Sequence, residues 1–239
     1  MYKEIIEELQ TFAEPNFAKW IKPYLNINKD SKEIVLGIRV PKLRLLAKKY
    51  RAIDLSCLKK LLTSKVHEER ELALFIMLIK AKSNPQEMFD LYINNLEYIN
   101  NWDLIDYTAP HIIAPIITET QLRELAQSDY LWANRVAMVS TIYYIKKNNF
   151  CLALEFAEKF INHPHHLMHK ASGWMLREIG KRDLNTLMEF LTKHEKQMPA
   201  IMRSYAKEIL RKSWISYFFL LSLIQNFEDK RVWIQPNIW

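Results

Sequence analysis

Residues 101–106 of this chain read Asn101-Trp102-Asp103-Leu104-Ile105-Asp106 and follow a polar turn rich in asparagine. Asn101 is a residue type that often caps a helix start. On a helix, Trp102 and Asp106 share one face, because they lie four residues apart. An aromatic ring and a carboxylate on one face suit a cationic substrate or a cationic transition state. The alternative is a tryptophan that anchors the core and an aspartate that favours the helix dipole.

The length of 239 residues fits one large domain or two small ones, and the hydrophobic content of 49% is ample for a core. The net charge of +7 favours a polyanion or an anionic surface as partner. The start of the chain carries acidic residues where a secretion signal would be apolar. The longest apolar run, Trp214–Ile224, is too short to span a bilayer.

Glycine and cysteine exclude several classes of protein. Only three glycines occur, which is too few for the tight turns of a sheet protein. The same scarcity excludes a phosphate-binding glycine loop, a dinucleotide fingerprint and a glycine-bearing helix-hairpin-helix. The two cysteines, Cys57 and Cys151, stand alone, so they support neither a zinc knuckle nor a disulfide framework. We expect buried free thiols in a reducing cytosol.

Apolar residues recur at helical spacing along the chain, and no stretch alternates with the period of a strand, so the predicted class is all-α. An extended segment is expected only at Ile34–Pro41, with Pro41 opening the next helix. Pro110 and Pro115 predict a break. The longest helix is expected over Asp129–Lys147, and Gly180 is expected to close a helix that starts at His166. The remaining helices are expected at 2–13, 16–26, 41–50, 54–62, 68–80, 85–99, 118–127, 152–160, 184–191, 199–212 and 214–225, and a further one begins near Trp102.

A pattern repeats along these helices: a basic residue is followed two or three places later by a small one. The pairs are Arg70 with Ala73, Arg135 with Ala137, Lys170 with Gly173, and Arg203 with Ala206. Successive basic residues are 65, 35 and 33 residues apart, and Trp102 fills the gap at 32 residues after Arg70. A period of 33–35 residues with two helices per unit indicates an α-solenoid. One concave wall would then gather Trp102, Asp106, Arg135, Trp174 and Arg177; the alternative is a plain scaffold with solvated basic residues.

Four stretches resemble the AlkD-type DNA alkylation-repair glycosylases. They are Leu36-Gly37-Ile38-Arg39-Val40-Pro41, the 101–106 stretch, Trp132-Ala133-Asn134-Arg135, and Lys170-Ala171-Ser172-Gly173-Trp174-Met175-Leu176-Arg177-Glu178. The resemblance spans about residues 4–212. It implies a right-handed superhelix of HEAT-like repeats whose basic concave face holds duplex DNA, and removal of cationic alkylated purines, chiefly 3-methyladenine and 7-methylguanine.

The resemblance also implies roles for individual residues. Trp102 and Trp174 match the two rings that contact the sugar and backbone of the damaged nucleotide, and Asp106 matches the catalytic carboxylate. Arg135 and Arg177 match positions that hold the phosphate backbone beside the lesion. Trp20 stands where the family usually has an aromatic residue. Lys170, Arg39 and Arg44 are expected to contact DNA as well, although the basic residues at 39–49 could equally form a solvated helix face.

The chemistry of the residues agrees with a monofunctional glycosylase. An alkylated purine is already cationic and leaves as a neutral base, so no general acid is needed. Asp106 could stabilise an oxocarbenium-like sugar or orient the attacking water. No lysine motif indicates strand cleavage through a Schiff base. The alternatives are a non-catalytic relative that binds DNA by its shape, and a HEAT-type scaffold for protein interaction.

The remaining expectations concern metals, partners and domain limits. His165 and His169 have zinc-like spacing, but the absence of a nearby acidic or cysteine ligand favours a loop that caps the next helix. The resemblance implies no metal and no cofactor. We expect one domain over residues 1–212, and an apolar segment at 213–239 that is a capping helix and tail or an association surface. We expect a monomer that binds no membrane and lies in the cytoplasm with the nucleoid.

Overall fold

The computed structural model describes residues 1–25, 27 and 31–210. These residues form helices joined by short loops, and their only β-type pairing is an isolated bridge between Ile34 and Val66. This confirms the all-α class. The α-helices, in order, are α1 (Tyr2–Gln10), α2 (Pro15–Ile21), α3 (Val40–Lys49), α4 (Leu55–Leu62), α5 (His67–Lys80), α6 (Pro85–Ile93), α7 (Trp102–Asp106), α8 (Ala109–Ile112), α9 (Glu119–Gln127), α10 (Leu131–Ser140), α11 (Ile142–Ile145), α12 (Cys151–Lys159), α13 (His166–Gly180), α14 (Leu184–His194) and α15 (Ala200–Ala206). Two 3₁₀ turns lie at Leu96–Tyr98 and Phe160–Asn162.

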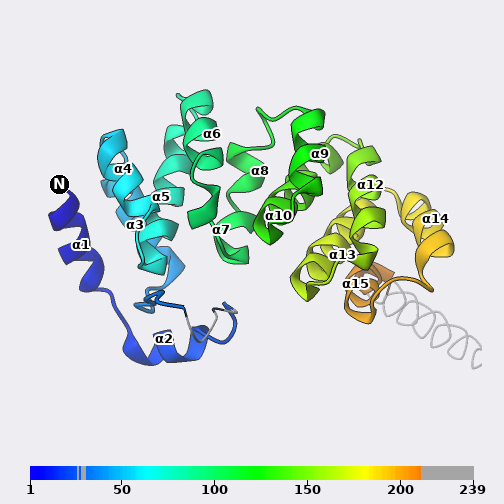
Figure 1. The fold of residues 1–239 in the computed structure, drawn as a ribbon, viewed down its shortest axis with the longest axis horizontal. Coiled ribbons are helices and arrows are strands. Elements are labelled where there is room, and N and C mark those ends of the chain that lie inside the picture. Colours follow the sequence, from blue (N-terminus) through cyan, green and yellow to red (C-terminus); the bar gives the residue numbers. More distant parts are fainter. Residues whose placement is uncertain (26, 28–30, 211–239) are drawn as a thin grey trace, which may run out of the picture.

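The helices form an arch of two rows (Figure 1). The outer row contains α4, α6, α9, α12 and α14, and the inner row contains α5, α7, α10, α13 and α15. The inner helices begin at residues 67, 102, 131, 166 and 200, which are steps of 29 to 35 residues. The predicted repeat of two helices per unit is therefore present. Its right-handed sense stays a prediction.

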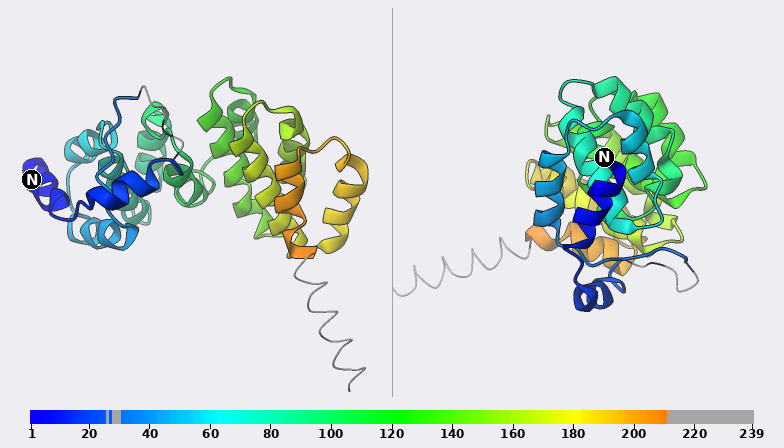
Figure 2. Two further views of the ribbon diagram at one scale, coloured as in Figure 1. Left: turned by 90° about the horizontal axis from the view of Figure 1, so that it is seen from below. Right: turned by 90° about the vertical axis from the view of Figure 1, so that its left-hand side faces the viewer.

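Helix α2 stands apart from both rows and lies below the N-terminal part of the arch (Figures 1 and 2). The extended segment that follows it is fixed by Glu68, whose carboxylate accepts hydrogen bonds from the backbone N–H groups of residues 36, 37 and 38 at 2.7–3.3 Å. Gly37 has a φ of 78°, and a Cβ there would lie 2.4 Å from the nitrogen of Ala18 and the oxygen of Glu14. Only glycine suits this position, because the backbone is left-handed and α2 is in contact.

Several helix starts follow from their first residues. Pro15 and Pro85 each occupy the first position of a helix, where the missing N–H is not needed. The Asp54 carboxylate accepts from the N–H of Cys57 at 2.7 Å. Thr118 and Gln121 form a full capping box on α9. The helical structure is interrupted by turns at residues 107–108 and after Ile112, so the predicted break near Pro110 and Pro115 is present.

The expected single helix over residues 129–147 is wrong, because Thr141 divides it into α10 and α11. Both the N–H and the hydroxyl of Thr141 donate to the carbonyl of Met138, at 3.2 and 2.6 Å, which tightens the turn locally. Among the described residues the longest helix is α13, with 15 residues.

Close packing of the units depends on small residues, as the repeat pattern predicts. A Cβ on Gly173 would lie 2.5 Å from the carbonyl oxygen of Met202 in α15. Gly180 is the last residue of α13, as predicted, and its φ is not positive. Its role is contact: a Cβ there would lie 2.4 Å from Leu187 of α14. The described helices include none that is long and apolar enough to cross a membrane.

The predicted helix near residues 199–212 is present as α15 and further helical residues up to 210, the end of the described range. The predicted capping helix within 213–239 lies outside the described residues. The 1–212 limit of the domain stays a prediction.

Candidate active site

The short helix α7 carries the candidate site, and its start is tied to the chain just after α2. The Asn101 side chain accepts from the N–H of Trp102 at 2.8 Å, which confirms the predicted cap. Its amide nitrogen donates to the carbonyl of Leu25 at 2.8 Å. The Trp102 indole N–H donates to the carbonyl of Tyr24 at 3.0 Å. The two hydrogen bonds to the carbonyls of Leu25 and Tyr24 therefore fix the direction of α7 and of the Trp102 ring.

Asp106 at the end of α7 is held by Arg135 of α10. The two parallel hydrogen bonds of this pair, Nε to Oδ1 and Nη2 to Oδ2, are both 2.8 Å long. Arg135 also donates from Nη1 to the carbonyl of Leu167, at the start of α13, at 2.7 Å. The Arg135 side chain is 5% exposed and that of Asp106 is 20% exposed. The two hydrogen bonds thus fix the orientation of the Asp106 carboxylate, which remains partly accessible to solvent.

The electrostatics of Asp106 combine two opposing causes. Burial raises the pKa of the Asp106 carboxyl above its usual range, while the Arg135 guanidinium opposes that shift. A buried arginine pair of this geometry favours the ionised acid and fixes where its negative charge points. The arrangement can stabilise a cation brought to the exposed edge of Asp106, or accept a proton from a water bound there.

Trp174 and Arg177 lie on α13, the next inner helix after α10. The Trp174 indole N–H donates to Glu178 at 3.2 Å. Arg177 forms ion pairs with Glu208 and, at 3.5 Å, with Glu178. The structure therefore joins Asp106 directly to Arg135 and places Trp174 on the neighbouring helix. The described contacts include none between Trp102 and Trp174, and the predicted roles of Trp174 and Arg177 stay predictions.

Trp20 belongs to an aromatic ladder on and after α2. Its ring lies 5.5 Å from that of Phe17 and 4.9 Å from that of Tyr24, whose carbonyl binds Trp102. Trp20 itself is 57% exposed. Arg39 packs over Phe17 at 4.2 Å and pairs with Glu14. The ladder thus leads from the exposed Trp20 towards the site helix.

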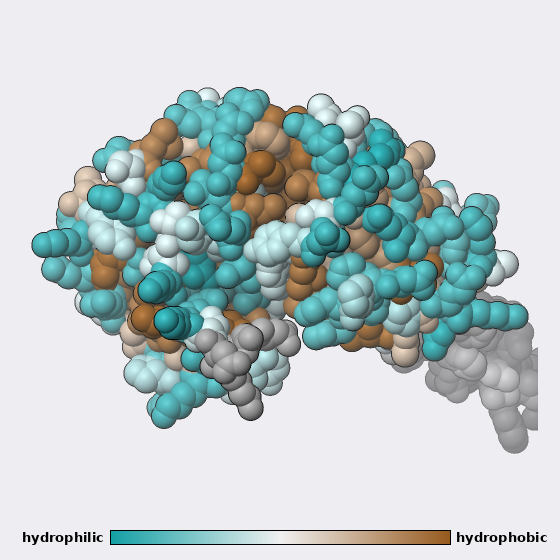
Figure 3. Space-filling model, viewed as in Figure 1, coloured by the Kyte–Doolittle hydropathy of each residue, from teal (hydrophilic) through white to brown (hydrophobic). Residues whose placement is uncertain are grey.

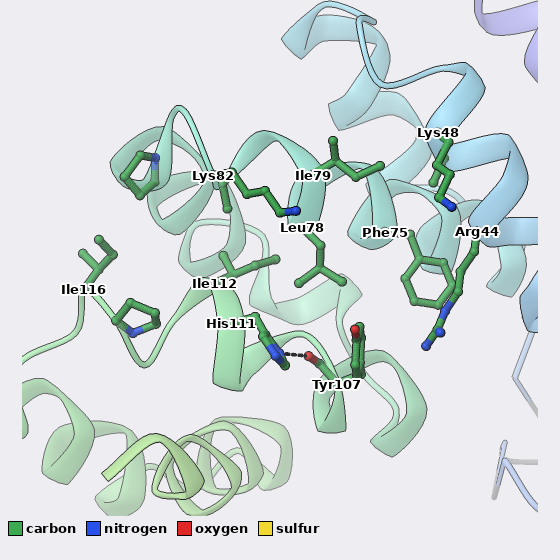
Figure 4. Close-up of a pocket in the computed structure, with 14 residues that line it drawn as sticks. Arg44, Lys48, Phe75, Leu78, Ile79, Lys82, Tyr107, His111, Ile112 and Ile116 are labelled. Carbon is green, nitrogen blue, oxygen red and sulfur yellow. Dashed lines mark hydrogen bonds between the residues drawn. The ribbon is translucent and has the colours of Figure 1, made fainter. Parts of the chain in front are cut away.

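Arg44 and Lys170 occupy different surroundings. Lys170 is half-buried on α13. Arg44 is exposed on α3 and lies over the rings of Phe75 and Tyr107, at 5.4 and 4.9 Å. It stands beside an apolar cavity of about 440 Å³ lined by Leu78, Ile79, Ile112 and others (Figure 4). Trp102, Asp106 and Trp174 do not line this cavity, so it is separate from the candidate site.

Two arginines that the repeat pattern singled out are not solvated surface residues. Arg70 and Arg135 are 3% and 4% exposed, and each binds a carboxylate. Because all three guanidinium nitrogens of Arg135 are already engaged within the protein, its predicted contact with a phosphate stays a prediction. Polar residues nevertheless cover most of the face seen in Figure 3.

Sequence reasoning missed a buried polar cluster on the other side of α7. His67 binds Glu33 through Nδ1 and Asp103 through Nε2, both at 2.7 Å. Burial lowers the pKa of His67, but Asp103 and Glu33 outweigh it and raise that pKa to about 10. Burial raises the pKa of the nearby Glu71 to about 8. The spacing of four residues between His67 and Glu71 was the available signal, whereas Glu33 lies in a polar loop that gave none.

The histidines at positions 163, 165, 166 and 169, here called the histidine cluster, provide the cap at the start of α13, as the sequence favoured. His165 is the N-cap of α13, and its Nδ1 accepts from the N–H of Leu167 at 3.2 Å. His163 accepts from the N–H of His165 and contacts Asn134. Within the described chain, the group of side chains with metal-binding proximity is instead His67, Glu71 and Asp103.

Comparison with known proteins shows the family of this chain. Residues 5–210 match the model of the family described as DNA alkylation repair enzyme. The fold is similar to that of a predicted DNA alkylation repair enzyme from Enterococcus faecalis, with a TM-score of 0.62 and 14% identity over 82% of this chain and 95% of that one. It is also similar to AlkD2 from Streptococcus mutans, with a TM-score of 0.53 and 18% identity over 81% of this chain and 97% of that one. A search of curated proteins gave no match. The family match covers most of the chain, and on that ground the protein belongs to the DNA alkylation repair enzyme family.

Proposed function

We propose that the protein is a monofunctional DNA glycosylase that hydrolyses the N-glycosidic bond of cationic alkylated purines, such as 3-methyladenine and 7-methylguanine, in duplex DNA. The observation that carries the proposal is the fixed, partly exposed carboxylate of Asp106, on the same short helix as Trp102. Membership of a DNA repair family supports DNA as the partner. The protein acts as a monomer in the cytoplasm, without a cofactor.

The reaction needs little from the protein beyond stabilising charge. Alkylation at N3 or N7 makes the purine cationic, so the base leaves neutral and no acid has to protonate it. The positive charge then develops on the sugar. A carboxylate about 4 Å away stabilises such a charge by roughly 4 kcal/mol at an effective dielectric near 20. That corresponds to a rate increase on the order of a thousandfold.

The Arg135 pair changes this estimate in two ways. Its positive charge weakens the field of Asp106 at the sugar, so roughly 4 kcal/mol is an upper figure. It also holds the carboxylate ionised and oriented before the substrate arrives, and such preorganisation costs no rearrangement during the reaction. Asp106 either faces the sugar directly or orients the attacking water. The rings of Trp102 and Trp174 would each add about 0.5–2 kcal/mol against the charged sugar.

A second candidate is a relative that binds DNA by its shape and releases no base. The same Asp106–Arg135 pair favours this candidate, because a carboxylate neutralised by arginine can serve packing alone. An interaction scaffold for proteins is less favoured, since the chain belongs to a DNA repair family.

The test is to incubate the protein with duplex DNA that carries methylated purines and to measure the free base released. Release without strand cleavage, in the absence of alkali or an added lyase, supports a monofunctional glycosylase. Cut strands under those conditions would mean a lyase activity. Binding of the DNA with no base released would leave the shape-binding candidate.

A further inference from the structure

Three side chains that commonly bind metals meet between α5 and α7. His67 and Glu71 lie four residues apart on α5, and Asp103 lies on α7. One potential ligand atom from each lies within 4.8 Å of the other two. His67 is 2% exposed and the Asp103 side chain is 19% exposed. Two packed helices therefore present one nitrogen and two carboxylates to a common point.

Among the residues that the structure describes, none pairs with Glu71, the third member of this cluster. It is 9% exposed, and none of the described residues forms a hydrogen bond or an ion pair with its carboxyl group. Its neighbours on α5 are all engaged: Glu68 binds the backbone at residues 36–38, Glu69 binds Tyr2, and Arg70 binds Glu33. A buried carboxyl group without a partner is costly. Something that fits the common point would offset that cost.

The surroundings of His67 and Asp103 already have the form of an outer shell. The Nδ1 atom of His67 contacts Glu33, which fixes the ring and leaves Nε2 facing Asp103. Metal-binding histidines usually bond a carboxylate in this way through their other nitrogen. One Asp103 oxygen accepts from the N–H of Leu104 at 2.9 Å, and the other faces His67. The Nε2 atom of His67 and one Asp103 oxygen thus face each other, while Glu33 and the N–H of Leu104 hold the other ends of these two side chains.

We propose that His67, Glu71 and Asp103 form a binding site for a divalent transition-metal ion, with Zn²⁺ as the best fit. One neutral imidazole and two carboxylates would carry a charge of −2, which balances the ion. The ion would take the place of the proton that His67 and Asp103 share. The imidazole ligand favours Zn²⁺ over Mg²⁺ and Ca²⁺, which prefer sites made of oxygen alone.

Binding would join α5 to α7, the helix that also carries Trp102 and Asp106. The ion would therefore stabilise the fold around the candidate active site while touching none of the reacting groups. The proposal is independent of the glycosylase reaction, since it needs only the cluster itself.

The experiment uses the full-length protein without an affinity tag, stripped with a chelator. Equilibrium dialysis against Zn²⁺, followed by elemental analysis, is expected to give one ion per chain. At a hundredfold excess over Kd the melting temperature Tm is expected to rise by roughly 5–10 °C. Mg²⁺ at the same concentration is expected to leave Tm unchanged.

Two isosteric variants and one control locate the ion. Glu71→Gln and Asp103→Asn are each expected to lose the bound Zn²⁺ and the rise in Tm. His169→Gln, which alters the histidine cluster at the start of α13, is expected to keep both. If Glu71→Gln does not fold, Asp103→Asn and the visible spectrum of the Co²⁺-loaded wild type supply the same decision.

Three results would overturn the proposal. One is a wild type that takes up no stoichiometric Zn²⁺ at 100-fold excess over the protein concentration. Another is a Glu71→Gln variant that is folded and binds Zn²⁺ as the wild type does. The third is loss of the ion in His169→Gln alone, which would place it in the histidine cluster.

Discussion

Helix α7 carries two carboxylates three residues apart, and the two meet different neighbours. Asp103 faces α5 and belongs to a cluster with His67, Glu33 and Arg70. Asp106 faces α10 and pairs with Arg135. The two carboxylates are exposed to the same degree, 19% and 20%. Their exposure therefore does not distinguish them, and the difference lies in what holds them.

Asp103 links α7 to α5, whereas Asp106 is held in a fixed orientation with one edge accessible. Asp103 shares a cationic imidazole with Glu33, and one of its oxygens caps its own helix. Within the described part of the chain, Asp106 accepts hydrogen bonds from the planar guanidinium of Arg135 alone, and these leave the far edge of its carboxylate free. We therefore expect Asp103 to contribute to stability, and we propose that Asp106 contributes to the chemistry.

The largest effect on stability is expected from Arg135→Met. It would leave Asp106 without its cation and the carbonyl of Leu167 without its donor, at a cost of about 3–5 kcal/mol in the free energy of unfolding. Urea denaturation measures this. The matched control is the double variant Arg135→Met with Asp106→Asn, which is expected to recover part of the loss because no unpaired charge remains. A double variant that is less stable than the single one would argue against the pairing.

Next in size is His67→Gln, measured with a chelator present. Glutamine cannot supply a positive charge between Glu33 and Asp103, so the free energy of unfolding is expected to fall by about 2–4 kcal/mol. Base release by the folded fraction is expected to change little. A large loss of base release at unchanged stability would instead assign chemistry to the Asp103 side of α7.

The pH dependence of base release sharpens the comparison further. Asp106 must be ionised to stabilise a cation, and burial raises its pKa above the usual range. The single-turnover rate is therefore expected to fall as pH drops through that raised pKa, at a higher pH than for an ordinary aspartate. In Arg135→Gln the fall is expected at still higher pH, since the opposing charge is gone. If the rate of Arg135→Gln fell at the same pH as that of the wild type, another group would be responsible for the pH dependence.

The smallest effect is expected from Trp102→Phe. This change removes the hydrogen bond to the Tyr24 carbonyl and keeps a ring, so the cost is about 0.5–1.5 kcal/mol in the free energy of unfolding. Base release is expected to fall by less than tenfold. Trp20→Phe is the matched control, because its ring is exposed and no hydrogen bond of its indole is described. Equal losses in both variants would show that the link to Tyr24 has no special weight.

Much of the fold follows from local sequence signals. Pro15, Pro85, Asp54, Thr118 and Asn101 set helix starts that the structure confirms, because capping depends on a few neighbouring residues. The repeat could also be found, since it depends on residues such as Gly173 that allow close packing. The break at Thr141 could not, because apolar periodicity continues across it on both sides.

The site was predictable only in part. Spacing placed Trp102 and Asp106 on one face, and the repeat placed Arg135 on the adjacent inner helix. Spacing alone cannot show that Arg135 turns inward to Asp106 rather than outward to a phosphate, since that depends on burial between α7, α10 and α13. The bond from Trp102 to the chain after α2 was likewise invisible, because it joins residues 78 positions apart.

The most direct measurement compares Asp106→Asn with Asp103→Asn for both base release and Tm. Asp106→Asn is expected to lose up to about a thousandfold in the single-turnover rate and to keep Tm within a few degrees. Asp103→Asn is expected to lower Tm and to keep the rate of its folded fraction within tenfold. The reverse pattern, with activity lost in Asp103→Asn and kept in Asp106→Asn, would contradict the assignment of chemistry to Asp106.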